Sequence, residues 1–91
     1  MASKQEIFAR AWARWHELQF DMVMEECAEL IQAVVKFRRG ITGSLEHLAE
    51  ETADVELMCE QLRAMGNGFD ELVDKHKVAK LARLGERLGI E

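Results

Sequence analysis

Apolar residues recur along the chain at the three- and four-residue spacing of an α-helix, and no segment alternates strictly as a half-buried strand does. Glycines interrupt the pattern in "GITG" and "GNG", and the chain has no proline. Glycine clusters between periodic segments are typical of loops. The pattern therefore predicts an all-α protein. The four expected helices run from about 4 to 17, from about 19 to 39, from Ser44 to near Gly66, and from about 69 to 88.

The residues at the expected helix ends agree with this reading. Ser3 and Glu6 have the spacing of a capping box, in which a serine and a glutamate satisfy free amides of the first turn. Ser44 is expected to be the N-cap of the third helix. The second helix should stop at Gly40, after a basic last turn that complements the helix dipole.

Two acidic segments, "EECAEL" (25–30) and "EETAD" (50–54), interleave carboxylates with residues of core character. At about 100° per residue, Glu26 and Glu51 fall inside the apolar arcs of their helices. The other acids lie at the edge of an arc, as do Glu29 and Asp54, or on the polar side, as does Glu25. Each helix is thus expected to direct one carboxylate inward and to place a second one at the rim.

Converging carboxylates cannot all remain ionised in an apolar interior without compensation, because burial and mutual repulsion both disfavour the charge. They could be protonated or paired with Lys or Arg, or they could hold a hard divalent cation such as Mg²⁺ or Mn²⁺. Lys77 lies within the apolar stripe of the fourth helix, and Lys80 flanks that stripe. An inward lysine could neutralise the acids, contact a phosphate beside a bound metal, or extend to solvent.

The two acidic segments resemble the EExxE…ExxD signature of the MazG-like, all-α nucleoside triphosphate pyrophosphohydrolases. The first half matches Glu25, Glu26 and Glu29; 21 residues later, the second half matches Glu51 and Asp54. The flanking sequences "FDMVMEECAELIQAVVKFRRG", "LAEETADVELMCEQL" and "KVAKLARL" also look like those of short, phage-type members. The likeness covers roughly residues 5 to 88.

This resemblance implies a four-helix MazG-like bundle completed by homo-oligomerisation, as a homodimer or a dimer of dimers. It also implies a reaction, the hydrolysis of a nucleoside or deoxynucleoside triphosphate to the monophosphate and pyrophosphate. The cofactor would be Mg²⁺, with Mn²⁺ as a substitute. The second helix, apolar over about 240°, independently favours self-association, because one neighbour in a small bundle cannot cover so wide a face.

The resemblance also assigns roles to individual residues. The metal ligands would be Glu26, Glu29, Glu51 and Asp54, the four acids that the helical periodicity places within the apolar arcs or at their edges. The remaining catalytic candidates are three. Glu25 matches the first glutamate of the motif; it could orient a water, ligate a second ion, or be a solvated surface acid. Lys77 and Lys80 fall where the family carries basic residues that contact phosphates.

Composition restricts the classes of protein that remain. The 91 residues, 48% hydrophobic and 32% charged, fit a single globular domain over residues 1–91. The net charge of −5 argues against a general nucleic-acid binder. With no long apolar run and no signal-like start, we expect a cytoplasmic protein without a membrane partner. Cys27 and Cys59 are expected to be reduced, small buried residues.

Two other functions remain open at this stage. One is a phosphoribosyl-ATP pyrophosphatase, which shares the fold and the metal chemistry. The other is a non-catalytic helical interaction protein whose acids form a buried ion-pair network. Gln19 is expected at the surface at the start of a helix, and Phe8, Trp12 and Trp15 form an aromatic stripe expected to pack in the core or at a dimer contact.

Overall fold

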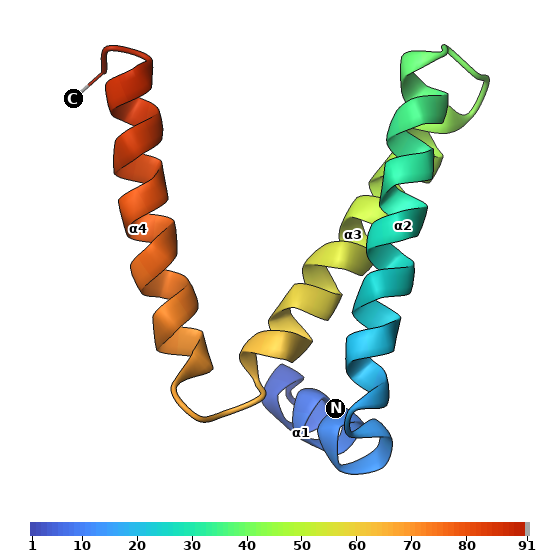
Figure 1. Cartoon of the computed structure of the whole chain (residues 1–91). Coiled ribbons are helices and arrows are strands. Elements are labelled where there is room, and N and C mark those ends of the chain that lie inside the picture. The colour runs from blue at the N-terminus through green and yellow to red at the C-terminus, as the bar shows by residue number, and fades with distance from the viewer. Residues whose placement is uncertain (91) are drawn as a thin grey trace.

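The computed structural model describes residues 1–90, which form four α-helices and contain no strand (Figure 1). The all-α prediction is therefore confirmed. Each predicted boundary lies within three residues of the observed one. The helices are α1 (Lys4–Trp15), α2 (Leu18–Arg38), α3 (Ser44–Arg63) and α4 (Phe69–Arg87).

One of the two predicted N-caps is confirmed and the other is wrong. The Ser3 hydroxyl accepts a hydrogen bond from the Glu6 amide at 3.1 Å, which caps α1 as expected. At the start of α3, however, the cap residue is Gly43, and Ser44 is already helical and buried. Gly43 has φ of +79°, a left-handed conformation that glycine adopts without steric cost. The glycine makes the turn, and the serine side chain makes no capping bond.

The core lies between α2 and α3, which run antiparallel along most of their lengths (Figure 1). Ala33 on α2 and Met58 on α3 are buried in this seam. The short helix α1 packs across the end of the pair. There Trp12 meets Phe20 edge to face, with ring centroids 5.8 Å apart, and its indole N–H donates to the Gln61 carbonyl at 2.6 Å. Trp12 is thus half-buried in these contacts, whereas Trp15 of the same predicted stripe is 38% exposed.

The fourth helix stands away from this arrangement. Within residues 1–90, α4 contacts α3 alone, next to the turn that joins them, and then diverges from the α2–α3 pair (Figure 1). No residue of α4 is buried. The four helices therefore do not close into a bundle within one chain, and completion of the bundle by a second copy stays a prediction.

None of the helices in the described part is sufficiently long and apolar to span a lipid bilayer.

Candidate metal centre

Three carboxylates from two helices meet in the seam between α2 and α3. One oxygen atom from each of Glu26, Glu51 and Asp54 lies within 4.8 Å of the other two. Glu26 comes from the middle of α2, whereas Glu51 and Asp54 lie one turn apart on α3. The antiparallel pairing of the helices brings together acids that are 25 or more positions apart in the sequence.

Burial follows the predicted helical periodicity. Glu51 is only 9% exposed, Glu26 is half-buried, and Asp54, Glu29 and Glu25 are exposed. The inward placement of Glu26 and Glu51 is thus confirmed. Their Oε2 atoms are buried and have no hydrogen-bond partner within the described chain. Buried polar atoms are seldom left without a partner, because desolvation is then uncompensated. A proton or a cation bound in the seam would supply the partner that these two oxygens lack.

The same crowding changes the protonation of the two inner acids. Burial raises the pKa of Glu26 and Glu51 above the ordinary value, and the negative charges of Glu29 and Asp54 raise it further. The side chain of Glu29 could accept a hydrogen bond from the protonated form of either acid, which raises the pKa in the same direction. Only His47, which is half-buried, lowers the pKa of Glu51. Glu29 therefore belongs electrostatically to the cluster.

No Lys or Arg side chain forms an ion pair with these acids within residues 1–90. The ion pairs there join Lys4 to Glu60 and Arg63 to two aspartates of α4, and none includes a member of the cluster. A single chain therefore does not form the buried ion-pair network that the interaction-protein alternative requires.

The donor set fits a hard divalent cation. All of the converging atoms are carboxylate oxygens, the ligands that Mg²⁺ and Mn²⁺ prefer, and no sulfur or imidazole ligand belongs to the group. A cation would also satisfy the two unpartnered oxygens and reverse the local repulsion. Glu26, Glu51 and Asp54 could hold such an ion. Glu29, whose charge raises the pKa of Glu26 and Glu51, would add negative charge near that ion.

The remaining sequence candidates lie farther from the cluster. Glu25 is exposed on α2, next to Glu26 in the chain but outside the group of converging oxygens. Lys77 and Lys80 are exposed on α4, which makes no contact with α2. A single chain therefore does not bring these two lysines to the acids.

Two expectations about burial are wrong. Gln19 was expected at the surface, yet it is fully buried; its side-chain oxygen accepts from Gln61 Nε2 at 2.8 Å, and its own Nε2 has no partner. The sequence did indicate this burial. Gln19 precedes Glu26 by seven residues, about two helical turns, so the two side chains lie on the same face of α2. Cys59 was expected to be buried and is exposed, and Cys27 is only half-buried.

No protein-family model, curated protein or solved structure matches this chain.

Proposed function

We propose that this protein hydrolyses a nucleoside or deoxynucleoside triphosphate to the monophosphate and pyrophosphate with Mg²⁺ as cofactor. The observation that carries the proposal is the convergence of carboxylates from α2 and α3, with two buried oxygens that lack a partner. The EExxE…ExxD spacing adds the class of reaction, through the resemblance to MazG-like enzymes. Carboxylates whose pKa is raised by burial and by neighbouring charges, as in this cluster, occur preferentially at functional sites.

In this proposal Glu26, Glu51 and Asp54 hold the cation, and Glu29 completes the acidic environment. A bound Mg²⁺ supplies Lewis-acid chemistry, offsetting charge on the phosphates and favouring attack by water at neutral pH. The reaction forms a bond between water oxygen and phosphorus and breaks the bridge between the α- and β-phosphates. Glu25, which is exposed and next to Glu26 in the chain, would orient the attacking water and take up the proton that it loses.

Lys77 and Lys80 would stabilise the negative charge that develops on the departing pyrophosphate. Because α4 of the same chain diverges from the cluster, these lysines would have to come from a second copy. The proposal thus includes self-association, as a homodimer or a dimer of dimers.

Product analysis tests the reaction directly. The protein would be incubated with a panel of canonical and modified NTPs and dNTPs and with phosphoribosyl-ATP, in Mg²⁺ and in EDTA. We expect a monophosphate and pyrophosphate, in Mg²⁺ only, from at least one nucleoside triphosphate. Turnover of phosphoribosyl-ATP alone would replace this substrate class with the alternative one. No turnover of any compound would contradict catalysis.

Glu51→Gln tests the ligand assignment. The amide keeps the shape of the side chain but loses the anionic oxygen, so Mg²⁺-dependent turnover should be abolished while the helical circular dichroism persists. Glu50→Gln is the matched control, because Glu50 precedes Glu51 on the same helix and is exposed. Full activity of Glu51→Gln with normal metal dependence would show that this residue is not a ligand.

A further inference from the structure

The carboxylates of the candidate metal centre follow one edge of the seam between α2 and α3. On each helix the exposed acid follows the inward glutamate by three residues, about 300° around the helix axis. In an antiparallel pair, this equal rotation places Glu29 of α2 and Asp54 of α3 on the same edge of the seam. Both acids raise the pKa of Glu26 and Glu51, which agrees with that placement. We call this edge, which carries Glu29 and Asp54, the acidic edge.

Two basic residues lie on the acidic edge beyond the carboxylates. Lys36 follows Glu29 on α2 by seven residues, about two helical turns, and so lies on the same line along the helix. His47 precedes Asp54 on α3 by the same interval. Because the helices are antiparallel, both basic residues are displaced toward the turn that joins α2 to α3, the end opposite α1 (Figure 1). One end of the acidic edge is therefore basic.

His47 is near enough to the carboxylates to act on them. It is half-buried, and its positive charge lowers the pKa of Glu51, which lies one turn farther along α3. Its amide donates to the Gly43 carbonyl at 3.2 Å, which fixes the residue in the first turn of the helix. The Lys36 carbonyl accepts from the Ile41 amide at 3.3 Å, so its backbone is held by the same turn. The ion pairs of the described chain include neither side chain, so both can bind an anion.

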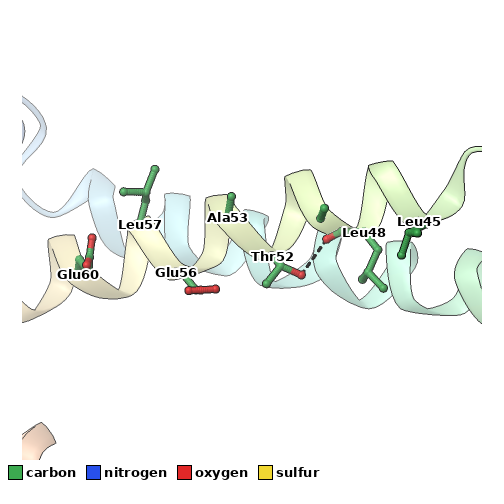
Figure 2. Close-up of a pocket in the computed structure, with 8 residues that line it drawn as sticks. Leu45, Leu48, Thr52, Ala53, Glu56, Leu57 and Glu60 are labelled. Atoms are coloured by element: carbon green, nitrogen blue, oxygen red, sulfur yellow. Dashed lines mark hydrogen bonds between the residues drawn. The ribbon is translucent and has the colours of Figure 1, made fainter.

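The other side of α3 offers an anion no such partner. The groove that faces away from α2 is lined by leucine, alanine and threonine, with Glu56 and Glu60 toward the carboxyl end of the helix (Figure 2). No Lys, Arg or His belongs to its lining, and the Thr52 hydroxyl already donates to the Leu48 carbonyl at 2.7 Å. Of these two sides of α3, the acidic edge is therefore the one where a phosphate beside the metal meets cationic groups.

The spacing fits a polyphosphate chain that is held at the metal site. At about 1.5 Å per residue, His47 lies roughly 6 Å from Glu51 along α3. Lys36 lies roughly 10 Å from Glu29 along α2, and its flexible four-carbon stem can bring the ammonium group back toward the cluster. Phosphates next to the reacting one would thus lie between the metal and these two donors.

We propose that Lys36 and His47 bind the β- and γ-phosphates of the substrate, so that its pyrophosphate half lies toward the α2–α3 turn. The inference rests on the proposed function, because it assigns residues to the same substrate. An ammonium group and an imidazole N–H both donate to phosphate oxygens, and hydrogen bonds between ionised groups are stronger than neutral ones. Lys77 and Lys80 of a second copy keep their role at the same leaving group, which would then be held from two chains.

Binding of pyrophosphate tests these contacts without turnover. Isothermal titration calorimetry in Mg²⁺ would compare the unsubstituted chain with His47→Ala, Lys36→Met and Arg38→Met. Loss of one hydrogen bond to a charged group should raise the dissociation constant of pyrophosphate about tenfold in the first two variants. Arg38→Met is the matched control and should bind as the parent does, because Arg38 is exposed two positions from Lys36, on another side of α2.

The same four chains show whether the metal site is intact, since Mg²⁺ alone should still raise the melting temperature of each. No binding of pyrophosphate by the unsubstituted chain would overturn the proposal. Parent-like binding by either His47→Ala or Lys36→Met would overturn it as well.

Steady-state kinetics separates failure of this inference from failure of the proposed function. Pyrophosphate should inhibit His47→Ala and Lys36→Met about tenfold less strongly than the parent. Inhibition by the monophosphate product should not change, since that product lacks the β- and γ-phosphates. Turnover with parent-like KM and parent-like pyrophosphate inhibition in both variants would overturn the inference and keep the proposed function. Pyrophosphate binding that depends on both residues, without hydrolysis of any triphosphate, would support the contacts and contradict the proposed function.

Discussion

Glu51 is the most enclosed charged residue of the α2–α3 seam, since only 9% of it is exposed and its Oε2 has no hydrogen-bond partner. The unfolded chain would give this carboxyl an ordinary pKa of 4.5, whereas burial and the charges of Glu29 and Asp54 raise the pKa in the folded chain. Between these two values the folded state binds more protons than the unfolded one. Stability from protonated Glu51 is therefore fully present below pH 4.5 and is lost as the pH rises through the raised pKa.

Glu51→Gln should consequently stabilise the metal-free protein at pH 7.5 relative to the unsubstituted chain, because the amide cannot ionise. The advantage should shrink as the pH falls and disappear near pH 4. Melting temperatures measured in EDTA across this range test the prediction. Glu50→Gln, on the exposed side of α3, should show no comparable pH-dependent advantage. A Glu51→Gln variant that melts lower than the parent in EDTA at pH 7.5 would contradict it.

The pair formed by Gln19 and Gln61 is asymmetric in its burial. Gln19 is fully buried, and Gln61 is half-buried and donates the one side-chain hydrogen bond that Gln19 accepts. Gln61→Leu should leave both polar atoms of Gln19 without a partner and cost about 1–3 kcal/mol of unfolding free energy. Adding Gln19→Leu should recover part of that loss, because both partners are then apolar. Urea unfolding of the two single variants and the double variant measures this coupling, and equal losses in Gln61→Leu and the double variant would refute it.

At the scale of the elements, the turn between α3 and α4 decides the direction of the last helix. Gly66 and Gly68 allow the left-handed backbone there, and Arg63 links the end of α3 to the first turns of α4. These are contacts between exposed carboxylates and a partly buried guanidinium, so their effect on global stability should be small. Their effect on local order should be larger.

Arg63→Ala should therefore accelerate amide hydrogen exchange in residues 64–74 and leave exchange in the middle of α2 and α3 unchanged. Hydrogen exchange with mass spectrometry resolves these segments. Arg39→Ala is the control, since it removes an exposed arginine at the carboxyl end of α2, at the opposite end of the α2–α3 pair from this turn (Figure 1). Unchanged exchange in residues 64–74 of Arg63→Ala would show that backbone conformation alone holds the turn.

At the scale of the whole molecule, the core of one chain is small. The buried apolar residues are Ala11, Ala33 and Met58, while many large apolar residues of α2, α3 and α4 remain exposed. A chain of 91 residues buries only about two-thirds of the surface of its unfolded state even when it is well packed. The repulsion among the seam carboxylates further destabilises the folded chain. Metal binding and self-association should therefore both raise its stability.

Mg²⁺ should raise the melting temperature at pH 7.5 beyond the effect of ionic strength. A ligand that binds only the folded state stabilises it by about 2.7 kcal/mol when present at 100 times its dissociation constant. The rise should be lost in Asp54→Asn, which removes one of the three converging carboxylates. It should be kept in Glu56→Gln, because Glu56 is exposed on α3 and is not one of these carboxylates. Thermal scans in MgCl₂ against NaCl of equal ionic strength test this. An equal response of the parent and Asp54→Asn would exclude the site.

Helical periodicity by itself determined the four helices and the direction of their acids. The apolar arcs of the second and third helices predicted that Glu26 and Glu51 face inward, and both do. Side-chain direction within a helix follows from 3.6 residues per turn, so it can be read from spacing alone. The same rule placed Glu25 on the exposed side.

The tertiary structure alone decided which helices meet. It joined Glu26 to Glu51 and Asp54 by pairing α2 with α3, buried Gln19 next to Gln61 of α3, and directed α4 and Lys77 away from the acids. The last outcome depends on the turn at Gly66–Gly68 and on Arg63, a local geometry that hydrophobic spacing does not encode. Periodicity gives each helix a face, but the backbone angles between helices and the competition among apolar surfaces decide what that face contacts.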